Sequence, residues 1–169
     1  MIKLEDRIPG PERSGATDDW VLPTDDRERM LEFRGRFLGV ASSRKRLHAS
    51  GAHYGRDHAG TKDKCGACRW FEARIFRAAD DQHQQIAGRW LVYRLGRSAV
   101  PGEVDLRSYE WLETAADVVE ALTTRPADGD PFLSGPAYLV LQSAARHDPE
   151  IAHARSQLVD DGDEEAQEA

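Results

Sequence analysis

Cysteine and long apolar runs are the features that this sequence has least of. Only two of its 169 residues are cysteine, Cys65 and Cys68. The longest uninterrupted apolar run spans residues 137–141, whereas a membrane-spanning helix needs about 20 apolar residues. Charged side chains at residues 5–7 stand where a signal peptide would need an apolar segment. We therefore expect a cytoplasmic protein, whose two thiols stay reduced unless a metal binds them.

Lysine is also scarce, because arginine outnumbers it nineteen to four. This bias is typical of GC-rich genomes and predicts a bacterium, or one of its phages, as the source. The net charge of -7 is unevenly distributed, with -4 on residues 1–26, +8 on residues 27–77 and -11 on residues 78–169. A basic middle between acidic ends is the clearest asymmetry of the chain.

Two-residue alternation of apolar side chains predicts an antiparallel β-meander of three to four strands over about residues 29–112. The strands are expected at about 29–42, 69–78, 88–97 and 106–112. We expect the apolar residues of 31–37, 71–75 and 91–95 to share one interior, which would turn the arginines between them outward.

Helical periodicity replaces the alternation after residue 114 and predicts two to three helices over about residues 114–158, packed on the meander. Thr114 and Asp117 have the spacing of a capping box. The fold class is therefore α+β.

Three parts of the chain are expected. Residues 1–28 are expected to form an extended N-terminal arm. Residues 29–158 are expected to form a single α+β domain with a His- and Cys-containing loop at 43–68. Residues 159–169 form an acidic tail with nothing apolar enough to hold it, and we expect it to be disordered.

Three segments carry a resemblance. FRGRFLGVASS (Phe33–Ser43), CRWFEARIFR (Cys68–Arg77) and RWLVYRLGRS (Arg89–Ser98) together resemble small uncharacterised proteins of high-GC bacteria, their phages and mobile elements. The similarity covers about the central half of the chain. It implies a shared β-meander and no particular activity.

The cysteine pair is the first candidate site. Cys65 and Cys68 are separated by two residues, the spacing that lets two thiolates bind one metal ion, and His53 and His58 are the nearest further ligands. These four residues predict a structural zinc site. The alternative, which the sequence leaves open, is a pair of reduced thiols in a solvated loop.

The basic middle is the second candidate site. Arginine and lysine side chains near aromatic rings are typical of surfaces that bind nucleic acid. The candidate residues are Arg34, Arg36, Arg44, Lys45, Arg46, Lys64, Arg69 and Arg74. The same cations could instead form a solvated surface that the acidic ends of the chain balance.

No complete catalytic set is present in the sequence, which has neither a nucleophile elbow nor a glycine-rich phosphate loop. We therefore predict a small non-enzymatic binding or regulatory protein that contacts nucleic acid or a protein partner through its basic sheet face and its His/Cys loop. The enzymatic alternative is a metal-dependent nuclease that uses Asp57 and His58, although a second cysteine pair and a helix with a further ligand are missing.

Overall fold

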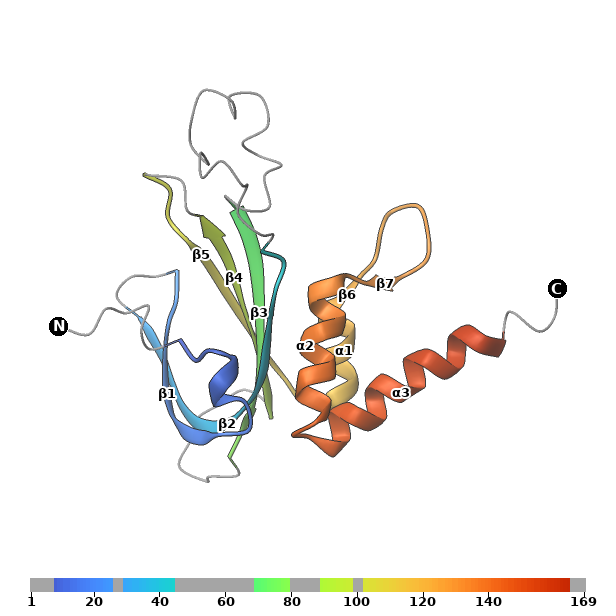
Figure 1. Ribbon diagram of the computed structural model, residues 1–169, viewed down its shortest axis with the longest axis horizontal. Coiled ribbons are helices and arrows are strands. Elements are labelled where there is room, and N and C mark those ends of the chain that lie inside the picture. The colour runs from blue at the N-terminus through green and yellow to red at the C-terminus, as the bar shows by residue number, and fades with distance from the viewer. Residues whose placement is uncertain (1–7, 26–28, 45–68, 80–88, 99–101, 165–169) are drawn as a thin grey trace.

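The computed structural model describes residues 8–25, 29–44, 69–79, 89–98 and 102–164, with side chains described only as far as residue 158. Within these ranges the main element is a five-stranded antiparallel sheet in the order β1–β2–β3–β4–β5. Helices α1, α2 and α3 follow the sheet in the chain and stand beside it (Figure 1). The predicted α+β class is confirmed. The elements are η2 (Pro11–Arg13), β1 (Thr17–Pro23), β2 (Met30–Ser42), β3 (Arg69–Ala78), β4 (Trp90–Ser98), β5 (Leu106–Leu112), α1 (Ala115–Leu122), β6 (Thr123–Thr124), β7 (Phe132–Leu133), α2 (Gly135–Ala145) and α3 (Pro149–Glu164).

The prediction of three to four strands is too low, because a further strand lies in the segment predicted to be an N-terminal arm. β1 pairs with β2 from Thr17 opposite Arg36 to Pro23 opposite Met30. Its Trp20 is only 2% exposed. A strand with so few buried positions, set among prolines and charges, gives too short an apolar alternation to stand out in the sequence.

Halfway along β2, the alternation of its side chains between the two faces of the sheet shifts by one residue. Its first half pairs with β1 and its second half with β3, and the register shifts between Phe37 and Gly39. Before the shift, Phe33 and Phe37 pack on one face of the sheet; after it, Val40 packs on the same face and Ala41 on the other. A bulge of this kind bends the strand and increases its twist.

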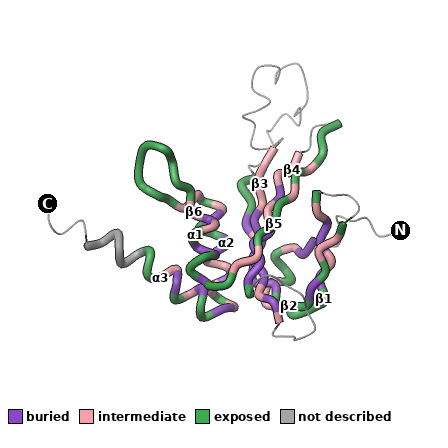
Figure 2. The backbone as a smooth tube through the Cα atoms, turned by 180° about the vertical axis from the view of Figure 1, so that it is seen from behind, coloured by how far each residue is buried: buried purple, intermediate pink, exposed green. Residues whose placement is uncertain are grey.

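The sheet buries apolar side chains on both faces, which corrects the prediction of a single shared interior. Ile75 and Val92 belong to the cluster that packs against the helices, whereas Phe37 and Leu91 belong to a second cluster on the opposite face. We call these the helix face and the inner face. The strands that carry them are apolar at consecutive positions, and a two-residue pattern cannot assign such strands to one face. Figure 2 shows buried residues along the strands and an exposed loop between β6 and β7.

The inner face curls upon itself around a group of aromatic rings. Phe33 of β2 and Trp111 of β5 lie edge to face with ring centroids 5.3 Å apart, although β3 and β4 separate their strands in the sheet. Phe33 also meets Phe76 at 5.3 Å, and Trp20 meets Phe76 at 5.6 Å. Edge-to-face geometry is the favoured arrangement of aromatic pairs.

The helices cover the other face, and each begins at an identifiable cap. The capping box of α1 is confirmed, since the Thr114 hydroxyl accepts from the backbone of Asp117 and the Asp117 side chain accepts from the backbone of Thr114. α2 packs closely against β2 at Gly39. A Cβ at this position would come within 2.3 Å of the Ser143 hydroxyl, so a side chain here would force the two elements apart. Among the helices described, none combines the length and apolar character that crossing a bilayer requires.

α3 runs further than predicted. The sequence placed its end near residue 158 and a disordered tail at 159–169, but residues 159–164 continue the helix. Residues 165–169 lie outside the described ranges.

Asp148 joins the helical layer to the sheet. Its side chain is fully buried, and its Oδ2 accepts hydrogen bonds from Arg77 of β3 at 3.0 Å and from the indole of Trp90 of β4 at 3.1 Å. Its Oδ1 accepts from the backbone amides of Glu150 and Ile151, in the first turn of α3. One carboxylate therefore both caps α3 and holds it to two strands.

We expect the substitution Asp148→Ala to lower the free energy of unfolding by about 3 kcal/mol, since it leaves a buried indole N–H unpaired, removes the cap of α3 and leaves Arg77 with Glu150 as its remaining carboxylate partner. Urea unfolding followed by circular dichroism measures the loss. Asp128→Ala, in the exposed loop between β6 and β7, is the matched control. A D148A variant as stable as this control would contradict the role assigned to Asp148.

Candidate functional site

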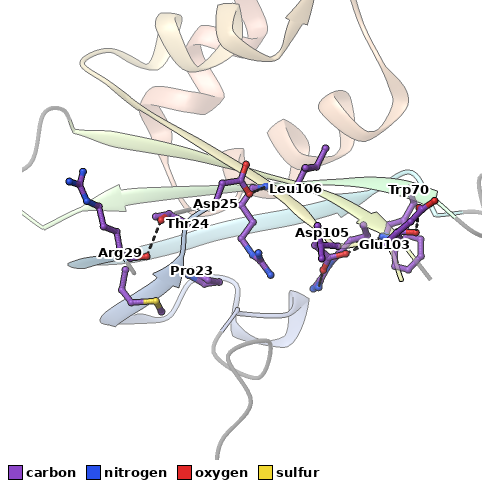
Figure 3. A pocket seen from close by; sticks show the side chains of 13 residues that line it. Pro23, Thr24, Asp25, Arg29, Trp70, Glu103, Asp105 and Leu106 are labelled. Carbon is purple, nitrogen blue, oxygen red and sulfur yellow. Dashed lines mark hydrogen bonds and ion pairs between the residues drawn. The ribbon is translucent and has the colours of Figure 1, made fainter. Parts of the chain in front are cut away.

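The inner face ends in a hollow of about 720 Å³ that we call the arginine pocket. Figure 3 shows Pro23, Thr24, Asp25 and Arg29, from the end of β1 and the turn before β2, on one side of it, and Trp70, Glu103 and Asp105 on the other. The lining residues are Pro23, Thr24, Asp25, Arg29, Met30, Trp70, Arg97, Ser98, Glu103, Val104, Asp105, Leu106 and Arg107.

Two arginines in or beside the pocket are paired with half-buried carboxylates. Arg97 donates to Asp105 at 2.7 Å and lies 3.5 Å from Glu72, and Arg74 donates to Glu72 at 2.9 Å. Burial alone would raise the pKa of Glu72, but the hydrogen bond from the Trp70 indole and the charges of Arg74 and Arg97 hold it below its usual value. Glu72 is therefore a carboxylate that serves two guanidinium groups.

Arg107 is the exception among these cations. Its backbone N–H donates to the Asp25 carboxylate at 2.6 Å, but its guanidinium has no hydrogen-bond or ion-pair partner within the described part of the chain. The Nε atom of Arg107 is buried without a hydrogen-bond partner, as are those of Arg97 and Arg155, but the guanidinium groups of Arg97 and Arg155 make other contacts. A buried polar atom without a partner is rare in folded proteins and calls for an explanation.

Tyr93 lies where three of these cations converge. Its hydroxyl donates to the Pro23 carbonyl at 2.6 Å and so holds the end of β1 over the sheet. Burial raises the pKa of Tyr93 to about 12, against the opposing charges of Arg107, Arg74 and Arg97. The phenol therefore stays protonated at neutral pH and serves as a donor.

The raised pKa of Tyr93 predicts a loss of stability in alkali. Since an unfolded tyrosine ionises near pH 10, the stabilisation from the neutral phenol is complete below pH 10 and disappears as the pH rises to about 12. Urea unfolding at pH 9 and pH 11 measures this loss. Tyr93→Phe should lose less stability than the wild type over this interval, and equal losses would contradict the assignment.

The basic residues predicted to form one outward wall do not do so where the structure describes them. Arg34 and Arg36 are exposed on the half of β2 that pairs with β1, and Arg36 donates to the His147 carbonyl at 3.2 Å. Arg74 is the clear correction, because its side chain is buried on the inner face and donates to the Pro9 carbonyl at 3.0 Å and to Glu72. An arginine amid apolar alternation can be buried when a carboxylate two residues away accompanies it.

Two other predicted cations lie near the arginine pocket. The Arg44 guanidinium stacks 4.1 Å from the centroid of the Trp70 ring, and Arg69 donates to Glu103 at 2.8 Å. Lys45, Arg46 and Lys64 lie outside the described residues. The structure thus brings Arg44, Arg69 and Arg74 to the same end of the sheet but leaves Arg34 and Arg36 elsewhere.

The predicted zinc ligands Cys65, Cys68, His53 and His58 also lie outside the described residues, as do Asp57 and the rest of the nuclease alternative. Within the ranges that are described, no three His, Cys, Asp or Glu side chains gather as a metal site would require.

The zinc site stays a prediction, and the metal content of the protein tests it directly. Purified protein should contain about one zinc ion per chain, because four ligands of this type complete a tetrahedral site. Mass spectrometry under native conditions counts the bound metal, and Cys65→Ser should remove it. Wild-type protein that is folded and free of metal would contradict the prediction.

The sequence analysis missed Arg97, Arg107 and Tyr93. A signal was present, since alternation along residues 106–112 puts Arg107 on the same face as Tyr109 and Trp111, and the register places that face beside Tyr93. The curl of the sheet, which brings Asp25 and the end of β1 over Arg107, could not be inferred from the sequence.

No protein-family model, no curated protein and no solved structure matches this chain. The resemblance to small proteins of high-GC bacteria and their phages stays a prediction.

Proposed function

We propose that the protein is a non-enzymatic binding protein that holds an anionic group of its ligand in the arginine pocket. The observation that carries this proposal is the guanidinium of Arg107, which faces the pocket region without a partner among the described residues.

An anion is the natural complement of such a group. A guanidinium presents five N–H donors in a planar fork that matches carboxylate and phosphate oxygens. The neighbouring Arg97 and Arg74 already have carboxylate partners. Arg107 therefore supplies the charge at this end of the sheet that a ligand would satisfy, in surroundings where partial burial strengthens a charge-assisted hydrogen bond.

Binding fits the pocket better than catalysis because its carboxylates are already engaged. Asp105 accepts from Arg97 and from the backbone of Ser98, and Glu103 accepts from Arg69 and the Ser98 hydroxyl. A general acid or base would have to give up such contacts before it could exchange a proton with a substrate. These residues instead orient the cations around the hollow.

A protein partner is favoured over nucleic acid as the source of the anion. The described members of the predicted basic surface are divided between two places, and Arg74 and Arg69 have acidic partners. A surface that follows a nucleic-acid backbone needs several cations free to displace counterions. A pocket with one unsatisfied guanidinium suits a single anionic group. The nuclease alternative gains no support, since Asp57 and His58 are not described.

We expect millimolar acetate or inorganic phosphate to shift the NMR signals of the Arg107 side-chain Nε–H and of the Leu106 and Tyr93 amides. Arg107→Gln should weaken this binding at least about tenfold, the effect of losing one charge-assisted hydrogen bond. Arg125→Gln is the control, because Arg125 is exposed and pairs with Glu120 outside the pocket. Equal shifts in R107Q and the wild type would contradict the proposal.

A further inference from the structure

We infer that the arginine pocket and the outer edge of β5 together hold the extended C-terminal end of a partner polypeptide, which adds a strand to β5 and places its terminal carboxylate on Arg107. This inference rests on the proposed function and names the partner of the same site.

The first support is the outer edge of β5, which pairs with no other strand among the described residues. The Leu112 carbonyl accepts from Arg89 and so faces the β4 side, whereas the Arg107 amide faces away from β4 and reaches Asp25. Because backbone groups alternate along a strand, those of Tyr109 and Trp111 also face outward. Within the described chain, neither residue has a backbone partner on that side.

The second support is the direction in which an added strand would run. Every neighbouring pair in the sheet is antiparallel, and β5 starts beside the pocket with Leu106. A further strand in the same antiparallel sense would run from Leu112 toward Leu106, so that its C-terminal end arrives at Arg107. Asp25 occupies the Arg107 amide and stops the backbone ladder at that point.

The third support is a groove that connects the edge with the pocket. A hollow of about 660 Å³ shares Thr24, Asp25, Arg29, Met30 and Arg107 with the arginine pocket and extends along the edge to Ser108 and Tyr109. Its walls are thus the turn before β2 and the edge of β5.

The surface of β5 also fits a strand partner. Leu106 is 65% exposed and Tyr109 is 45% exposed, so apolar contacts are available beside the backbone groups. β5 contains neither proline nor a bulge, two of the devices that natural proteins use to block an exposed edge. Main-chain pairing at a sheet edge combined with capture of a carboxylate is an established way to recognise a peptide end.

The test compares three mixtures of acetylated hexapeptides of randomised sequence at millimolar concentration. One has free C-terminal carboxylates, one has C-terminal amides, and one has free carboxylates but N-methyl groups on alternate peptide bonds. The measurement is hydrogen exchange of the Tyr109 and Trp111 amides by NMR. We expect the free-carboxylate mixture to slow this exchange at least fivefold, and the other two mixtures to leave it unchanged.

The matched protein variants are Arg107→Gln, which should abolish the protection, and Arg125→Gln, which should retain it. A C-terminally amidated mixture that ends in glutamate distinguishes a side-chain carboxylate from a terminal one, and equal protection by it would overturn the terminal assignment. Tyr109→Pro removes one outward N–H from an edge position, where proline is tolerated. It should lose the peptide and keep acetate binding.

The outcomes separate the two proposals. If acetate shifts Arg107 but no peptide protects Tyr109 and Trp111, the strand addition is wrong and the anion pocket stands. If the N-methylated mixture protects as well as its parent, or a single-stranded oligonucleotide perturbs the edge when peptides do not, the peptide inference is overturned. If neither acetate nor peptide reaches Arg107, both proposals fail.

Discussion

The structure depends on burying both faces of a single antiparallel sheet. The helices cover one face, and aromatic rings gathered by the curl of the sheet cover much of the other. The bulge in β2 makes this arrangement consistent along one strand, because it keeps Phe33, Phe37 and Val40 on the same side. With apolar side chains filling most of both faces, three arginines of the inner face, Arg74, Arg97 and Arg107, lie toward one end of the sheet. Arg74 and Arg97 have carboxylate partners there, whereas the Arg107 guanidinium has none among the residues that the structure describes.

Charged side chains are buried or half-buried at two places in the structure, and the two places differ in how completely those side chains are paired. Where the helices meet the sheet, the buried Asp148 carboxylate is fully engaged by Arg77, Trp90 and the first turn of α3. Burial of a charge is tolerated there because every contact is made within the protein. At the arginine pocket, by contrast, the Arg107 guanidinium makes no such contact with any residue in the described part of the chain. This contrast supports a structural role for Asp148 and a ligand-binding role for Arg107.

The sequence was sufficient for the elements with strong periodicity. Alternation placed β2, β3 and β4, and the spacing of Thr114 and Asp117 located the start of α1. It was insufficient where tertiary packing decides the outcome. β1 is a strand because its Trp20 enters a cluster formed by other strands, and the face to which Ile75 points follows from register rather than from its own segment.

The candidate site was less accessible from the sequence for a similar reason. Charge counting drew attention to the basic middle, but the fate of each cation depends on which carboxylate the fold brings beside it. Arg74 is buried because its guanidinium pairs with Glu72 and donates to the Pro9 carbonyl. Pro9 and Arg74 are far apart in the chain, so only the fold brings them together. Arg107 differs from Arg74 and Arg97 only in the folded chain, where those two have carboxylate partners and it has none within the described ranges.

The most direct measurement is a crystal structure of the protein grown with acetate. The proposed function predicts an acetate ion within hydrogen-bond distance of the Arg107 guanidinium, enclosed by the lining of the arginine pocket. An Arg107 side chain that instead pairs with a carboxylate of its own chain, or extends into solvent with the pocket free of acetate, would contradict it.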